Sequence, residues 1–179
     1  SGQSSDHRNP PKNMFMLFIL SKESCTLMKT NLIPDYIVNE ANGIGYRIMY
    51  HSQPWDKAKA MCEQEGGKLA VPKSEEEFRF IQQLVRGMYY PNITGTDYKL
   101  LAWLGINNLA NYKVWTNVDG ENIEDTGYHT WTGEYNGNGF SDAPSEPHCV
   151  GLDAVNPGLR DYWCHRRQPY VCQKTPHSL

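Results

Sequence analysis

Four of the five cysteines form the pattern that most constrains how this chain can fold. Cys62 stands alone, whereas Cys149, Cys164 and Cys172 are crowded near the end of the chain. No two cysteines have the C-x-x-C spacing that zinc ribbons and redox motifs share. A disulfide framework is therefore favoured over reduced thiols or a metal site, and disulfides indicate an oxidising compartment.

Length and charge exclude several classes of partner. The chain has 179 residues with 39% hydrophobic content, which is enough for one sizeable core but short for two. Its 17 basic and 20 acidic residues give a net charge of −3, and no basic run is present. We therefore predict neither a nucleic acid nor an anionic membrane as partner. The apolar run at 14–20 is too short to span a bilayer.

The two ends of the chain differ in composition from its middle. Residues 1–13 are polar and are expected to form a flexible tail. Residues 14–43 are expected to be an N-terminal strand and extension that contains Cys25; the core of a signal sequence is the alternative for 14–20. We expect the compact domain to cover 44–174, with a short tail at 175–179.

Two helices are expected early in this domain. The first follows Pro54 and ends before Gly66-Gly67. The second follows Ser74, whose hydroxyl can cap the helix while Glu77 reaches back. The residues expected on the buried faces of the two helices are Trp55, Ala58, Met61 and Cys62, and Phe78, Ile81, Leu84, Val85 and Met88.

The other periodic segments predict strands, first at 46–50 and then at 100–106, 113–118, 149–155 and 170–173. Two helices followed by strands indicate an α+β fold. The segment 119–148 is long for a connection inside a compact domain, so we expect it to carry a binding loop.

Several separated motifs occur in the order typical of one family. They are Trp55-x-x-Ala58-x-x-x-Cys62, Gly67-x-Leu69-Ala70, Trp103-Leu104-Gly105-Ile106, Trp115 with Asp119-Gly120, and Asp161 within the cysteine series. Over residues 44–174 the chain resembles the C-type lectin-like domain. Residues 33–36, 43–46 and 54–55 also resemble insect haemolymph lectins of the lipopolysaccharide-binding and immulectin type.

The resemblance implies two helices packed on small antiparallel sheets, a long binding loop, and disulfides Cys62–Cys172 and Cys149–Cys164. By loop closure these bridges would contribute on the order of 5 and 3 kcal/mol. The resemblance also implies that sugars bind through calcium. Because calcium takes about six to eight oxygen ligands, sugar hydroxyls can replace its waters.

The calcium ligands that the resemblance implies are Glu134, Asn136, Glu146 and Asp161, in an order typical of mannose-type sites. In this sequence Tyr135 stands where the family has a cis proline. A cis peptide before a residue other than proline costs about 2.5–4 kcal/mol, so we expect a trans bond and an altered ligand spacing. Pro147 occupies the family's glutamate position, which leaves Glu146 shifted by one residue.

Arg160 stands where the family has a ligand asparagine. A guanidinium about 4 Å from calcium would oppose each unit of its charge by roughly 4 kcal/mol. Two alternatives remain open. Calcium binds at this degenerate site, or Arg160 itself supplies the positive charge by pairing with Asp161 or Glu134.

Several of these residues also have interpretations that require no ligand. The candidate ligands could be solvated groups of a polar loop. Of the aromatic residues, Tyr135 is expected to be an exposed sugar contact, and Trp103, Trp115 and Trp163 are expected in the core. His148-Cys149 and Cys164-His165 could form a Cys2His2 site, although a disulfide is favoured.

The function implied is a secreted lectin that recognises microbial glycans, mannose-type or lipopolysaccharide, in an invertebrate haemolymph-like fluid. The alternative is a calcium-independent lectin-like domain that binds a protein partner or an anionic lipid-sugar. No motif supports catalysis. Asn92-Ile93-Thr94 is a glycosylation acceptor sequence. Cys25 lacks a partner and is a candidate for an interchain disulfide that would make a dimer.

Overall fold

The computed structural model describes residues 36–132 and 145–178, which belong to one compact unit beginning at Tyr36. The tail expected at 1–13, the strand expected at 14–20 and Cys25 lie outside the described residues. Within the described ranges, no helix is both long and apolar enough to cross a membrane.

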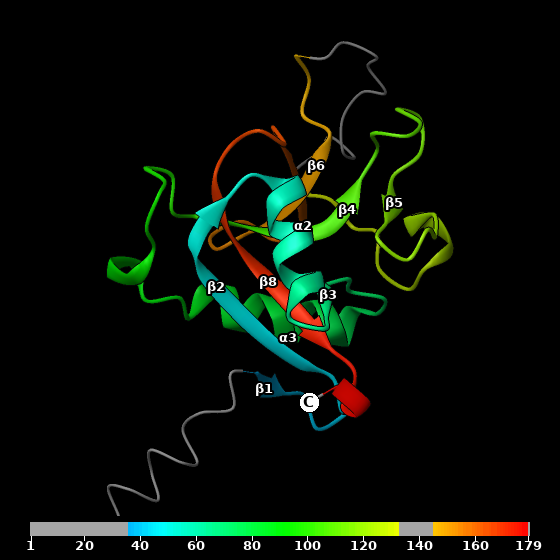
Figure 1. The fold of residues 1–179 in the computed structure, drawn as a ribbon. Helices are drawn as coiled ribbons and strands as arrows, with labels where there is room; N and C mark the ends of the chain where they lie inside the picture. Colours follow the sequence, from blue (N-terminus) through cyan, green and yellow to red (C-terminus); the bar gives the residue numbers. More distant parts are fainter. Residues whose placement is uncertain (1–35, 133–144, 179) are drawn as a thin grey trace, which may run out of the picture. The chain divides into compact units, whose positions relative to one another are not determined.

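One mixed sheet forms the centre of this unit (Figure 1). Its strands in the described part of the chain are β1 (Ile37–Val38), β2 (Gly45–Gln53), β3 (Lys68–Leu69), β4 (Leu101–Asn107), β5 (Thr116–Asn117), β6 (Cys149–Asp153), β7 (Leu159–Tyr162) and β8 (Gln168–Lys174). The main path runs β1-β2-β8-β4-β6-β7, with β3 joined to β8 and β5 joined to β4. Strands β4 and β8 run parallel, and the other paired strands are antiparallel.

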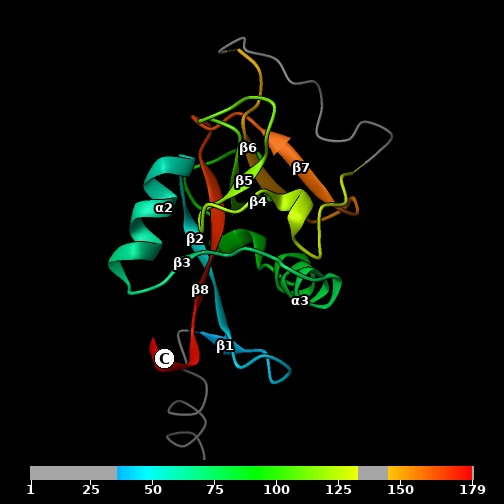
Figure 2. The same ribbon diagram turned by 90° about the vertical axis from the view of Figure 1, so that its right-hand side faces the viewer.

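Helices α2 (Trp55–Gln64) and α3 (Glu75–Arg86) lie on opposite sides of β2 and β8 (Figure 2). Short 3-10 turns follow at η1 (Tyr90–Asn92), η2 (Ile123–Asp125) and η3 (Pro176–Ser178). The two helices and the sheet confirm the α+β fold, although the strands join in a single mixed sheet.

The start of α3 agrees closely with the capping pattern in the sequence. The Ser74 hydroxyl accepts a hydrogen bond from the Glu77 backbone N–H at 3.1 Å. The Glu77 carboxylate reaches back to the backbone N–H of Lys73 at 2.8 Å, one residue before the cap. Two otherwise unpaired N–H groups are thereby satisfied, which fixes where the helix begins.

The buried face of α2 is narrower than the sequence pattern predicts. Trp55, Ala58 and Cys62 are buried, but Met61 is 37% exposed. Successive residues of a helix are rotated by about 100°, so Met61 lies to one side of the stripe that Cys62 occupies. Its assignment to the core was wrong.

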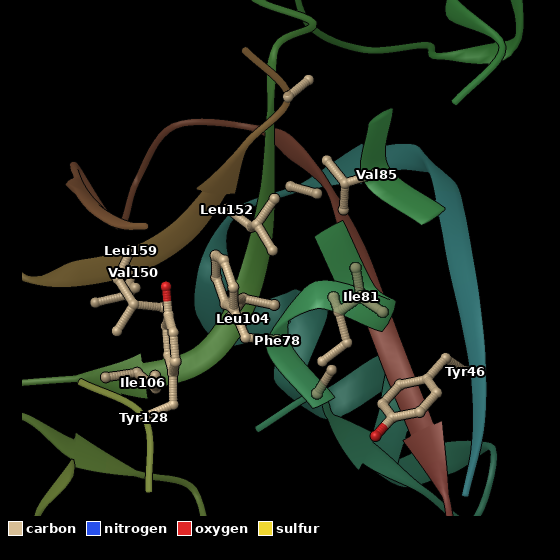
Figure 3. Packing of buried hydrophobic residues seen from close by; sticks show 14 of the residues in the cluster. Tyr46, Phe78, Ile81, Val85, Leu104, Ile106, Tyr128, Val150, Leu152 and Leu159 are labelled. Atoms are coloured by element: carbon tan, nitrogen blue, oxygen red, sulfur yellow. The ribbon is translucent and has the colours of Figure 1, made fainter. Parts of the chain in front are cut away.

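The sheet has a separate core on each face because side chains alternate along every strand. We call the cluster that includes Phe78, Ile81 and Val85 the α3-side core, and the cluster that includes Trp55, Ala58 and Cys62 the α2-side core. On β4, Ala102, Leu104 and Ile106 enter the first, whereas Leu101 and Trp103 enter the second. Figure 3 shows the α3-side core.

Both predicted disulfides are confirmed. Cys62–Cys172 joins α2 to β8 with a Cα–Cα distance of 5.4 Å. Cys149–Cys164 joins β6 to the residues after β7 with a Cα–Cα distance of 5.2 Å. The first bridge lies in the α2-side core. The second joins the start of β6 to the residues that follow β7.

One predicted strand is much shorter in the structure, and the strands β1, β3 and β7 were not predicted. Of the segment 113–118 only Thr116–Asn117 is a strand. The side-chain oxygens of Asn111 and Asn117 accept from the backbone N–H groups of Lys113 and Asp119, which holds the flanking backbone in turns. Strand β7 was not predicted, because its two central residues are charged and the sequence offers no alternating apolar pattern there.

Candidate functional site

The described residues on either side of 133–144 are both held by residues in or next to β7. At the departing end, the Thr132 backbone N–H donates to the Leu159 carbonyl at 2.8 Å, and the Leu159 N–H donates to the Thr130 carbonyl at 2.9 Å. Gly158 lies beside them with a φ of 85°, and a Cβ there would stand 2.7 Å from the Trp131 carbonyl carbon. A glycine is therefore required where the chain passes Trp131.

Trp163 holds the returning end. Its indole N–H donates to the Ser145 carbonyl at 2.7 Å, and the side chain is 39% exposed. The prediction that Trp163 lies in the core was wrong, whereas Trp103 and Trp115 are buried as predicted. Glu134, Tyr135 and Asn136 lie between these two anchors, outside the described residues.

Asp161 is the predicted ligand that the sheet itself positions. It lies on β7 opposite Val150 of β6, and Val150 packs in the α3-side core, so the Asp161 side chain is on that face. Burial raises the pKa of Asp161, and the negative charge of Glu146 raises it further, against the opposing effects of Arg160 and His148. Asp161 and Glu146 are thus close enough to repel each other.

Arg160 points to the other face of β7, because neighbouring residues of a strand alternate. Its guanidinium donates to the Asp153 carboxylate and to the Tyr98 hydroxyl, each at 2.6 Å. The guanidinium carbon also lies 5.6 Å and 5.9 Å from the ring centroids of Tyr98 and Tyr162. One of the two alternatives was a pairing with Asp161 or Glu134. Among the described residues the ion-pair partner is Asp153, and Glu134 lies outside them.

Asp153 is 1% exposed and ends strand β6. Burial alone would raise its pKa, but hydrogen bonds from the backbone N–H groups of Asn156 and Val155 and from Arg160 outweigh it, so the pKa is lowered. Asp153 is therefore ionised near neutral pH and holds Arg160 on its own face of the sheet.

Two of the predicted calcium ligands, Asp161 and Glu146, lie within the described residues. Both carry the carboxylate oxygens that calcium prefers, and the raised pKa of Asp161 comes mainly from burial, with a smaller contribution from the charge of Glu146. Residues 36–132 and 145–178 contain no group of three or more His, Cys, Asp and Glu side chains that could hold a metal. A complete ligand set therefore depends on Glu134 and Asn136.

The remaining predicted residues fall outside this region. Asn92 is exposed at the end of η1, where a glycan would be accessible. Cys149 and Cys164 are joined to each other, so neither supplies a thiolate to a Cys2His2 site. The ring Nδ1 of His148 lies 2.8 Å from the Asn108 side-chain oxygen.

Sequence reasoning missed the partners of Arg160. Asp153 and Tyr98 precede it by 7 and 62 residues. An aspartate inside the predicted apolar strand 149–155 was the available indication, because a buried carboxylate requires a partner. Nothing in the local sequence around Tyr98 indicates its role.

The fold and the two disulfides define a lectin-type domain, and the comparisons agree. A family model described as Lectin C-type domain matches residues 51–174. Because this match covers most of the chain, the chain belongs to the C-type lectin domain family, which is generally non-enzymatic.

Two relatives show how much of a longer protein the chain resembles. The hemolymph lipopolysaccharide-binding protein of Periplaneta americana is 28% identical over 133 residues, which cover 73% of this chain and 49% of that protein. C-type mannose receptor 2 of Homo sapiens is 28% identical over 125 residues, which cover 69% of this chain and 7% of the receptor. The chain thus spans about half or less of the length of these relatives.

Solved structures confirm the fold. The mouse scavenger receptor C-type lectin carbohydrate-recognition domain has a TM-score of 0.61 at 22% identity, covering 80% of this chain and 97% of that chain. A calcium-independent type II antifreeze protein has a TM-score of 0.59 at 21% identity, covering 80% and 93%. At these identities the likeness concerns the fold alone.

Proposed function

We propose that this chain is a secreted lectin that binds microbial surface glycans at the Asp161 face of β7. Membership in the C-type lectin domain family supports carbohydrate binding. The similarity to a hemolymph lipopolysaccharide-binding protein supports microbial glycans, mannose-type or lipopolysaccharide, as the ligand class and secretion as the location. A role in invertebrate innate immunity belongs to the same proposal.

The observation that carries the proposal is the position of Asp161. Its carboxylate has a raised pKa, lies near Glu146, and stands beside the anchored ends of the segment 133–144. Glu134 and Asn136 in that segment complete the proposed ligand set, with Tyr135 as an aromatic contact. When bound, calcium would coordinate vicinal sugar hydroxyls directly.

The protein residues have separate tasks in this proposal. Asp161 and Glu146 supply negative oxygens, while the Trp163 indole fixes the carbonyl of Ser145, which precedes Glu146. Asp153 keeps the Arg160 guanidinium on the opposite face. This arrangement separates the positive charge of Arg160 from the proposed cation, which removes the direct contact that would oppose calcium most strongly.

Binding to immobilised mannan and to lipopolysaccharide tests the proposal, with the same protein sample in calcium and in chelator. We expect retention on both ligands in calcium and release from mannan in chelator, and Asp161→Asn should abolish retention on mannan. Asp125→Asn is the matched control, because Asp125 is exposed in η2, and it should bind as the wild type does. Chelator-resistant retention on the neutral mannan would favour the calcium-independent alternative.

Clustering would strengthen a weak single site on a repetitive surface. Cys25 is the candidate for a disulfide-linked dimer, although it lies outside the described residues. Non-reducing electrophoresis of the full chain should show a dimer that Cys25→Ser converts to a monomer. A monomer in the wild type would remove this part of the proposal.

A further inference from the structure

A cavity separate from the Asp161 face lies on the α2 side of the sheet, beyond the Arg160 network, and we call it the second cavity. Segment 95–98, Tyr162 and the residues from His165 to Gln168 line it, and its volume is about 410 Å³. Pockets that hold small ligands typically measure about 300–1,000 Å³. The cavity is therefore large enough for a single sugar residue.

The rim of this cavity carries concentrated positive charge. His165, Arg166 and Arg167 are consecutive, exposed and part of its lining, whereas Asp97 is its one carboxylate. Within the ranges that the structure describes, neither arginine forms an ion pair. One Arg167 nitrogen makes only a long contact of 3.5 Å with the Ser52 carbonyl. Both guanidinium groups are thus free to bind a phosphate or carboxylate.

The cavity also contains an unsatisfied amide. Gln168 is 1% exposed; its Nε2 donates to the Thr96 hydroxyl at 3.4 Å, but its Oε1 is buried without a partner among the described residues. If the amide is rotated by 180°, the oxygen and nitrogen exchange places, and the nitrogen is then the atom without a partner. A ligand hydroxyl can both donate and accept, so it satisfies either orientation.

An aromatic wall completes the cavity. The rings of Tyr98 and Tyr162 stack with centroids 5.7 Å apart and an interplanar angle of 24°. Arg160 holds the Tyr98 hydroxyl and lies over both rings, while Asp153 fixes Arg160 in turn. These contacts hold both tyrosine side chains in place before a ligand binds.

We propose that this cavity binds a sugar residue bearing a phosphate or carboxylate group, without calcium and separately from the Asp161 face. Arg166 and Arg167 bind the anion, Gln168 bonds to a ring hydroxyl, and Tyr98 with Tyr162 supports the ring. Free phosphate provides only the anionic group that the two arginines would bind, and a neutral sugar provides only the hydroxyl that Gln168 would bind. Each should therefore bind more weakly than a sugar that carries both.

Isothermal titration of the full chain in EDTA tests this site. Four probes are titrated: mannose 6-phosphate, glucuronic acid, mannose and inorganic phosphate. At least one of the two anionic sugars should bind ten or more times more tightly than both mannose and inorganic phosphate. The tighter of the two identifies the anion, phosphate or carboxylate.

The double variant R166A/R167A should weaken binding of that sugar at least tenfold. The matched control K57A/R86A removes the same charge from exposed positions of α2 and α3, and it should change binding less than twofold. Absence of binding by both anionic sugars, equal binding of inorganic phosphate, or an unaffected R166A/R167A variant would each overturn the proposal. EDTA in every titration makes the result independent of calcium-dependent mannan binding.

Discussion

The two faces of strand β7 place adjacent charged residues in opposite situations. Arg160 meets a buried carboxylate, a hydroxyl and two aromatic rings, so its charge is satisfied inside the protein. Asp161 is half-buried near another carboxylate, and its pKa is raised. The comparison separates a structural charge from a functional candidate: the first is balanced by the fold, and the second gains from a cation supplied from outside.

The largest expected effect comes from removing the ion pair between Arg160 and Asp153. Arg160→Ala leaves Asp153 buried without its cationic partner, and it should lower the free energy of unfolding by about 3 kcal/mol. Urea unfolding in calcium-free buffer measures this change. Arg86→Ala, at an exposed position on α3, should stay within about 0.5 kcal/mol of the wild type. If Arg160→Ala costs less than about 1 kcal/mol, the backbone N–H donors alone are sufficient to stabilise the buried Asp153 carboxylate.

The other face should respond to calcium. At calcium concentrations about 100 times the dissociation constant, binding should stabilise the wild type by about 2.7 kcal/mol, and Asp161→Asn should abolish this gain. Thermal unfolding with and without calcium measures it. Without calcium, Asp161→Asn should be at least as stable as the wild type near neutral pH, because the fold disfavours the ionised carboxylate. An equal calcium response in both proteins would refute the assignment.

Acidification should affect the two aspartates in opposite ways. The Asp161 pKa is raised from 3.8, so the folded state binds a proton more readily and calcium-free stability rises as pH falls through that raised pKa. The Asp153 pKa is lowered, so its contribution is present above about 3.8 and is lost as pH falls through the lowered value. Urea unfolding between pH 7 and pH 3 should therefore show a rise in stability and then a fall. In Asp161→Asn the rise should disappear and the fall remain.

The smallest expected effect concerns the anchor of the returning chain. Trp163→Phe removes the indole donor to the Ser145 carbonyl and should cost about 1 kcal/mol of stability. Because Ser145 precedes Glu146, the same variant should weaken calcium-dependent mannan retention more than it weakens titration of the second cavity, whose Tyr162 ring Trp163 also contacts. Equal losses at both sites would indicate a general loosening of β7.

The helices were the most predictable part of the fold. Ser74 and Glu77 marked the start of α3 by a local capping pattern. The two hydrogen bonds of this cap join residues only three or four positions apart, so the sequence alone reveals it. Strand β7 was not predicted, because a strand with two central charges is stabilised by its neighbour β6 and not by its own apolar pattern. Met61 and Trp163 were misassigned for a related reason: apolar character does not specify a side chain's direction.

The candidate site divides in the same way. Family spacing indicated Asp161 and Glu146, whereas the second cavity draws on Tyr98, Gln168 and Arg166, which are far apart or unremarkable in the sequence. The pair Arg166-Arg167 beside Cys164 was visible as local charge. The burial of the Gln168 amide was not, because it depends on β8 lying in the middle of the sheet.

By itself, the sequence determined the α+β class through local periodicity, and its resemblance to the C-type lectin-like domain implied the family, the two disulfide pairs and the residue types for a sugar site. Only the tertiary structure decided that Arg160 binds Asp153 and that Asp161 faces the opposite way. The physical reason is the register between β6 and β7: it sets which side chains share a face, and the groups buried on that face then decide whether a charge is balanced inside the protein, as that of Arg160 is by Asp153.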